Sequence, residues 1–142
     1  MENMDNAQKD TILEVKDLTV SFDVYGRISH VLDGISFKVK KGERVGLVGE
    51  SGCGKTTTLK SVLNVLPKNA KINRGEVLFE GKNVFEMKDS ELAAMRRTGA
   101  GMIFQDPSSA LNPVFSIEKQ FITALKYAKP NNTPTKELYD IA

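Results

Sequence analysis

Gly49-Glu50-Ser51-Gly52-Cys53-Gly54-Lys55-Thr56 is the most informative segment of this 142-residue chain. It matches the pattern G-x-x-x-x-G-K-[ST], the P-loop or Walker A motif, in which backbone N–H groups cradle nucleotide phosphates. An apolar run at residues 44–48 predicts a strand before it, and apolar residues at helical spacing over residues 57–66 predict a helix after it. Unpaired N–H groups and the positive end of a helix dipole favour a polyphosphate at such a junction. The sequence therefore predicts a nucleotide-binding α/β fold.

Each position of this loop has a physical task. Gly49, Gly52 and Gly54 let the backbone turn tightly and approach phosphate oxygens without a Cβ clash. Lys55 supplies a mobile charge for the outer phosphates, and the Thr56 hydroxyl is a hard oxygen ligand suited to Mg²⁺. The other residues expected to contact the nucleotide are Glu50, Ser51, Cys53 and Thr57.

Bulk properties limit the function classes. The net charge of +2, from 20 Lys and Arg against 18 Asp and Glu, gives no support for a nucleic-acid partner. One cysteine excludes an internal disulfide and fits a reducing compartment. Residues 1–10 are polar and predict a disordered tail without a secretory signal, and no stretch approaches the roughly 18 apolar residues of a membrane span. The protein is expected to work at a membrane only by docking on another component.

Strand signals dominate the chain before the P-loop. Residues 12–22 predict a strand with a break near Lys16-Asp17, and residues 31–40 predict a second strand because Ile35, Phe37 and Val39 alternate. Residues 23–29 are expected to form the loop between them, and residues 41–43 a turn.

After the P-loop, helices and short strands are expected to alternate. The first helix should present Leu59, Val62, Leu63 and Leu66 inward and end at Pro67. Next come a polar connection (69–74), a strand (75–79), a tight turn (80–82), a return strand (83–85), and a short helix (91–97) capped by Asp89 or Ser90. The last expected elements are a buried strand (102–104), a loop (105–113), a helix from Ser116 to about Tyr127 with Ile117, Phe121, Ala124 and Leu125 on one face, and a helix from about residue 133.

Residues 13–22 and 31–37 resemble the antiparallel strands that open the ATP-binding subunits of ABC transporters. In that family an aromatic side chain at the end of the first strand stacks on adenine. The resemblance assigns this role to Phe22, with Tyr25 as the second choice.

Residues 101–113, Gly-Met-Ile-Phe-Gln-Asp-Pro-Ser-Ser-Ala-Leu-Asn-Pro, resemble the Q-loop of the oligopeptide, dipeptide and nickel importer ATPases. The resemblance implies that Gln105 reaches Mg²⁺ and the attacking water, and that this loop contacts a transmembrane subunit. Gln105 suits both tasks, because its side-chain carbonyl is a hard ligand and its amide can hold a water.

The fold implied by the resemblance is a P-loop NTPase of the ABC ATPase type. Residues 11–142 would form part of its ATP-binding domain, with an antiparallel β subdomain and P-loop core to about residue 113 and a helical subdomain starting at 114–142. No L-S-G-G-Q signature, Walker B acidic pair or switch histidine follows Gln105, and His30 precedes the P-loop. The sequence is thus expected to be the N-terminal portion of such a domain, inactive alone and prone to aggregate because its P-loop strand lacks neighbours.

The function implied is ATP hydrolysis that drives import of oligopeptides or dipeptides, with nickel or sugar as open alternatives. Lys55 and Gln105 are the expected catalytic residues, Thr56 and Gln105 the metal ligands, and ATP and Mg²⁺ the cofactors. The expected partners are a second ATP-binding subunit, two transmembrane permease subunits and, indirectly, an external binding protein, on the cytoplasmic face of the membrane. The rival interpretations are a non-catalytic nucleotide-binding fragment and a soluble ABC-type ATPase not coupled to transport.

Overall fold

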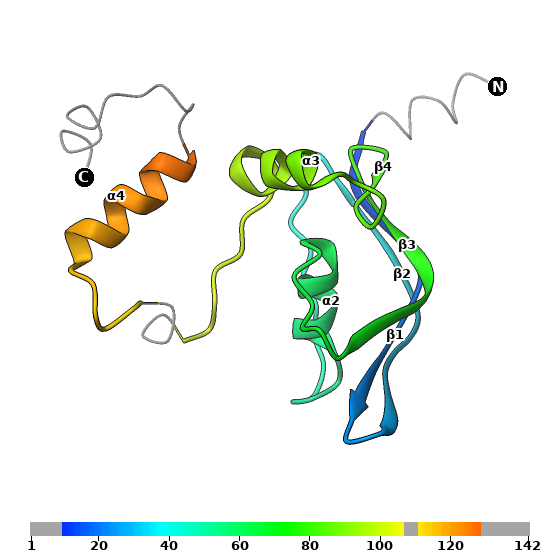
Figure 1. Ribbon diagram of the computed structural model, residues 1–142. Coiled ribbons are helices and arrows are strands. Elements are labelled where there is room, and N and C mark those ends of the chain that lie inside the picture. Colours follow the sequence, from blue (N-terminus) through cyan, green and yellow to red (C-terminus); the bar gives the residue numbers. More distant parts are fainter. Residues whose placement is uncertain (1–9, 107–110, 129–142) are drawn as a thin grey trace. The chain divides into compact units, whose positions relative to one another are not determined.

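A computed structural model describes residues 10–106 and 111–128 (Figure 1). The chain divides into two compact units, Met1–Leu92 and Ala93–Ala142. The first unit carries the P-loop, and the second carries Gln105. The expected tail before residue 10 and the expected helix from residue 133 lie outside the described residues, and the domain boundary expected near residue 113 stays a prediction.

The first unit is built on a four-stranded antiparallel sheet of order β2-β1-β3-β4. Its strands are β1 (Thr11–Val24), β2 (Arg27–Lys40), β3 (Ala70–Phe79) and β4 (Lys82–Asn83). The three long strands contribute Val15, Leu18, Val20, Leu32 and Val77 to the buried core. This sheet is the antiparallel β subdomain expected from the sequence.

β1 is interrupted at Asp17, where the register shifts against both neighbouring strands. Asp17 has a φ of 48°, and its carboxylate oxygens lie 2.8 and 2.9 Å from Nε and a terminal nitrogen of Arg74. Gly75 has a φ of 91°, and a Cβ there would collide with the main chain of Lys16 and Asp17. The break predicted near Lys16-Asp17 is confirmed as a bulge shared by the three strands.

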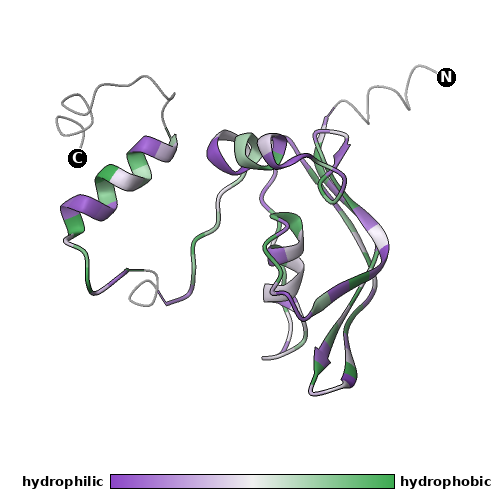
Figure 2. Cartoon of the chain, in the orientation of Figure 1, coloured by the Kyte–Doolittle hydropathy of each residue, from purple (hydrophilic) through white to green (hydrophobic). Residues whose placement is uncertain are grey.

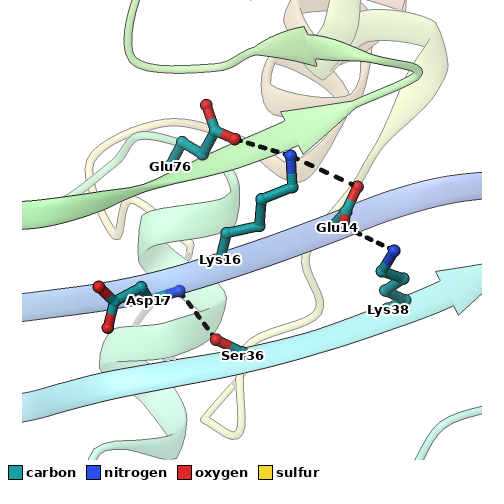
Figure 3. A network of polar contacts seen from close by, with 6 residues as sticks. All are labelled: Glu14, Lys16, Asp17, Ser36, Lys38 and Glu76. Atoms are coloured by element: carbon teal, nitrogen blue, oxygen red, sulfur yellow. Dashed lines mark hydrogen bonds and ion pairs between the residues drawn. The ribbon is translucent and has the colours of Figure 1, made fainter.

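Charged side chains link the three long strands beside this bulge (Figure 3). Glu14 of β1 is nearly buried, and its carboxylate lies 2.8 Å from Nζ of Lys38 on β2. Nζ of Lys16 lies 2.8 Å from Glu76 on β3 and 3.8 Å from Glu14. The hydrogen bond to Glu76 raises the pKa of Lys16 above its ordinary value. These contacts connect β2, β1 and β3 in one lateral chain of charges.

Two of the predicted connections are shorter than expected. The loop expected at residues 23–29 is a two-residue turn, Tyr25-Gly26, with positive φ at both residues. The polar connection expected at 69–74 is mostly strand, because it pairs with β1 and turns its polar side chains to solvent. The tight turn is confirmed at Glu80-Gly81, followed by the short return strand β4.

Helix α2 (Lys55–Val62) follows the P-loop and contacts β2. Leu59, expected to face inward, is 49% exposed, whereas Thr58 and Ser61 are buried together with Val62 and Leu63. The two hydroxyls can be buried because they donate to carbonyls four residues earlier, at 3.1 and 2.8 Å.

α2 ends before the expected stop at Pro67. Asn64 has a φ of 51°, its N–H donates to the Ser61 carbonyl at 3.0 Å, and the Val65 N–H donates to the Lys60 carbonyl at 2.9 Å. This pair of bonds is the Schellman pattern, which closes a helix at a residue in the left-handed region. Asn64 therefore ends α2.

The strand predicted at residues 44–48 is not formed. Val45 and Leu47 are about half exposed and Val48 is 95% exposed. The strand predicted at 102–104 is also absent, and Ile103 is 98% exposed. A strand is held by hydrogen bonds to neighbours, and within 10–106 and 111–128 neither segment belongs to a sheet.

Helix α3 (Asp89–Ala94) continues into the π-helical turn η1 (Met95–Gly99). Neither Asp89 nor Ser90 caps it as predicted. Lys88 occupies that position, because its carbonyl accepts from the Leu92 N–H at 3.0 Å and its N–H donates to Glu91 Oε2 at 3.2 Å.

In the second unit, α4 (Ile117–Ala128) begins as predicted, since Ser116 Oγ accepts from the Lys119 N–H at 3.3 Å. The predicted apolar face is wrong, because Ile122 is the buried residue while Ile117 and Phe121 are 53% and 55% exposed. Figure 2 shows hydrophobic and hydrophilic segments alternating along this helix. No helix in the described part of the chain has the length and apolar character that a membrane crossing requires.

Candidate nucleotide-binding site

The start of α2 is fixed against the sheet through Gly54. This residue is buried, with φ 96° and ψ 0°. A Cβ at this position would lie 2.6 Å from Leu32 Cδ2 and 3.0 Å from the carbonyl oxygen of Val31, both on β2. Both the backbone conformation and the close approach require glycine here. The helix N-terminus therefore packs closely against β2.

The first turn of α2 presents free donors. α2 begins at Lys55, and its first helical bond runs from the Thr58 N–H to the Gly54 carbonyl at 2.9 Å. The N–H groups of Lys55, Thr56 and Thr57 have no carbonyl four residues earlier within the helix to accept from them. Together with the helix dipole, these three donors give the helix end the features that favour an anion, which is where the sequence predicted phosphate binding.

The preceding loop closes on itself. The Cys53 N–H donates to the Glu50 carbonyl at 3.3 Å. A Cβ on Gly49 would lie 2.6 Å from Cys53 Sγ, so the two ends of the loop are in contact. Gly52 has a φ of 83° with open space around it, and Ser51 is exposed. The loop is thus compact at its base and open at its rim.

The Lys55 ammonium lies across this loop. Its Nζ donates to the carbonyl oxygens of Gly49 at 2.8 Å and Glu50 at 2.6 Å, and lies 3.5 Å from Cys53 Sγ. All three contacts are exposed to solvent. The lysine is therefore brought to the same loop as the free N–H groups, where phosphate oxygens can compete for its protons.

The residues present fit a nucleotide with a bound divalent cation. The Thr56 side chain is exposed beside the free N–H groups and offers a hydroxyl oxygen, the ligand type that Mg²⁺ prefers. Thr57 is half-buried and its carbonyl accepts from Ser61 Oγ at 2.8 Å. The glycine positions keep the loop free of side chains that would fill the cradle. The individual roles of these residues stay predictions.

The two aromatic candidates differ in exposure. Phe22 is half-buried in β1, opposite Ser29 of β2 and Ala70 of β3. Tyr25 is fully exposed at the tip of the β1–β2 hairpin. A half-buried ring is the better-fixed platform for a base, so Phe22 stays the predicted stacking residue.

Gln105 lies in the second unit, in an exposed segment without regular structure. Its role at the metal therefore still rests on the sequence, and residues 107–110 of the same loop lie outside the described part. Sequence reasoning missed Gln120 of α4, whose side chain binds the backbone of Asn112. No local pattern marks it, because the two residues are eight positions apart.

The comparisons with known proteins match this chain to ABC transporter proteins. The family model described as ABC transporter matches residues 32–141. A probable peptide ABC transporter ATP-binding protein, y4tR, of Sinorhizobium fredii is 40% identical over 127 residues, covering 89% of this chain and 38% of the relative. The oligopeptide transport ATP-binding protein OppD of Bacillus subtilis is 39% identical over 128 residues, covering 89% of this chain and 36% of the relative.

Among solved structures, the dimeric bacterial ABC transporter cassette MJ0796 matches with a TM-score of 0.74 and 24% identity, covering 90% of this chain and 53% of the cassette. A post-hydrolysis state of the same cassette, bound to ADP and Pi, matches equally well. These likenesses show the fold. The chain spans about a third of the length of the curated relatives it matches.

Proposed function

The chain belongs to the ABC transporter family, and on this premise we propose that it is the nucleotide-binding part of an ATPase subunit that drives peptide import. The observation that carries the proposal is the cradle at the start of α2, where Lys55 and three free N–H groups meet at one loop. The names of the relatives and the sequence of residues 101–113 support peptide as the cargo class.

Positioning and charge neutralisation are the proposed contributions of this chain to the reaction. ATP with Mg²⁺ supplies the phosphoanhydride that water cleaves. The loop N–H groups and Lys55 neutralise the phosphate charge, which is the dominant requirement of phosphoryl transfer. The Thr56 hydroxyl and the Gln105 side chain hold the metal, and Phe22 stacks on the base.

The proposed assembly follows the family. A second ATP-binding subunit completes the ATPase, in keeping with the dimeric cassette to which this fold is similar. Two permease subunits take up its motion, an external binding protein delivers the cargo, and the subunit lies on the cytoplasmic face of the membrane. Nickel or sugar is the alternative cargo.

Cys53 offers a direct test of the cradle. It is exposed and lies 3.5 Å from Lys55 Nζ, at the place where phosphates are proposed to bind. In the full-length subunit we expect Mg·ATP to slow the modification of Cys53 by a thiol reagent about tenfold or more. Mass spectrometry of the peptide that contains Cys53 measures the rate of modification. Equal rates with and without Mg·ATP would contradict nucleotide binding at this loop.

Transport tests the cargo class. In vesicles holding the complete transporter, we expect ATP hydrolysis to rise when peptide-loaded binding protein is added. If hydrolysis rises with nickel or sugar and not with peptide, the proposed cargo is wrong, while the ATPase assignment still holds. Hydrolysis that never responds to a binding protein would favour an ATPase not coupled to transport.

A further inference from the structure

The Gln120 side chain on α4 clamps the end of the loop that contains Gln105. Its Oε1 accepts from the Asn112 N–H at 2.9 Å, and its Nε2 donates to the Asn112 carbonyl at 3.1 Å. The same Nε2 donates to the Phe115 carbonyl at 2.9 Å. One side-chain amide therefore satisfies both backbone polar groups of Asn112 and a third group in the same segment.

The chemistry of this clamp is specific to a carboxamide. Only Asn and Gln carry an acceptor oxygen and a two-proton donor on one planar group. A glutamate at position 120 could accept from Asn112 but could not donate to the two carbonyls, and a lysine could not accept. Asparagine has the right group on a side chain shorter by one methylene.

The clamped segment is itself an ordered turn. Asn112 Oδ1 accepts from the Val114 N–H at 2.9 Å, and the Phe115 N–H donates to the Asn112 carbonyl at 3.3 Å. The Lys119 ammonium lies 4.4 Å from the centre of the Phe115 ring. Residues 112–115 are thus attached to the first turns of α4 by contacts from two helix residues.

We propose that Gln120 is a positioning residue for the coupled ATPase reaction, locking the C-terminal arm of the loop that contains Gln105 onto α4. The inference rests on the proposed function, in which residues 105–113 supply a metal ligand and the permease contact. Within the part of the loop that the structure describes, the two bonds from Gln120 to the backbone of Asn112 attach it to α4.

The consequence is mechanical. Asn112, bound to α4 at both backbone polar groups, moves with that helix, so a force on the helix reaches this end of the loop. Without the clamp, Asn112 can shift while α4 stays in place, so we expect permease motion to be transmitted less well to the loop that contains Gln105. Loss of the clamp should therefore reduce coupling and leave nucleotide affinity intact.

The test uses the full-length subunit assembled with its permease subunits in vesicles. Gln120→Met removes all three hydrogen bonds at similar side-chain length, and Gln120→Glu keeps only the one from the Asn112 N–H. Thr123→Ala is the matched control, because it removes a side-chain bond that stays within α4, from Thr123 Oγ1 to the Lys119 carbonyl. Nucleotide affinity, hydrolysis with and without cargo-loaded binding protein, and amide hydrogen exchange at Asn112 are measured for each variant.

For Gln120→Met we expect cargo stimulation of hydrolysis to fall about fivefold or more, ATP affinity to change less than about twofold, and exchange at Asn112 to speed up about tenfold. Gln120→Glu should give cargo stimulation and exchange rates between those of Gln120→Met and wild type. If Gln120→Met does not fold, Gln120→Glu is the variant that tests the proposal. Thr123→Ala should match wild type.

Normal cargo stimulation despite faster exchange at Asn112 would overturn the positioning role, because the clamp would then be structural only. A loss of ATP affinity equal to the loss of stimulation would overturn it as well. Failure of the proposed function is seen separately, in the wild-type assembly, as absent hydrolysis or absent protection of Cys53 by Mg·ATP.

Discussion

The Lys55 ammonium lies 2.6 Å from the carbonyl oxygen of Glu50 and spans the P-loop that it belongs to. Its second acceptor is the Gly49 carbonyl at 2.8 Å. Both bonds are exposed, so water can replace them at little cost to the fold. Phosphate oxygens carry charge and compete for the same protons more strongly than a neutral carbonyl does. The proposed role of Lys55 in phosphate binding can therefore be tested separately from its effect on stability.

Lys55→Ala in the full-length subunit is expected to lower ATP hydrolysis about 100-fold or more, because the charge on the phosphates loses its compensation. The free energy of unfolding should change by less than about 1 kcal/mol, since only exposed bonds are lost. Lys60→Ala is the matched control, as it removes the same charge from the same helix outside the loop. Phosphate release and thermal unfolding measure the two effects, and equal loss of hydrolysis in both variants would contradict a specific role for Lys55.

Gly54→Ala should separate packing from backbone strain when compared with Gly52→Ala. Both residues have positive φ, which costs an alanine about 1–2 kcal/mol. Only Gly54 also faces Leu32 and the Val31 carbonyl at 2.6 and 3.0 Å, which adds about 1–3 kcal/mol of overpacking. Denaturant unfolding of the full-length subunit measures the difference. Equal destabilisation would contradict the close approach of the start of α2 to β2.

Asn64 should be more tolerant of glycine than of alanine. Its φ of 51° lies in the left-handed region, where alanine is disfavoured by about 1–2 kcal/mol and glycine is not. Both substitutions remove the asparagine side chain, so their difference isolates the backbone. We expect Asn64→Gly to be more stable than Asn64→Ala by about 1 kcal/mol in thermal unfolding. A more stable alanine variant would show that the Schellman bonds do not depend on this conformation.

Local signals predicted much of the first unit. Alternation at Ile35, Phe37 and Val39 marks β2, and the charged pair Lys16-Asp17 marks the bulge, because each signal lies within a few residues. The P-loop was predictable for the same reason. Its donors come from consecutive residues, so the motif itself encodes their geometry.

The elements that were mispredicted depend on distant partners. Residues 44–48 and 102–104 have the composition of strands, but composition does not supply the neighbour that a strand needs. Residues 70–74, which were expected to form a connection, join β3 because β1 lies beside them. The clamp of Gln120 on Asn112 likewise depends on a turn that brings together residues eight positions apart.

Glu91 should make stability depend on pH in a defined direction. The Lys88 N–H, and then the Lys82 ammonium 3.3 Å away, hold the pKa of Glu91 below its ordinary value of 4.5. A lowered folded-state pKa means that the ionised form favours folding. This contribution is complete above the unfolded pKa and is lost as the pH falls through the lower folded value.

Glu91→Gln should therefore be less stable than wild type at pH 7, and the difference should vanish as the carboxylate of the wild type becomes protonated. Thermal unfolding of the full-length subunit between pH 7 and about pH 3 measures this, with Glu86→Gln, which removes an exposed carboxylate nearby, as the control for net charge. A difference that persists undiminished at the acid end would mean that the Glu91 side chain stabilises the start of α3 by its shape and not by its charge.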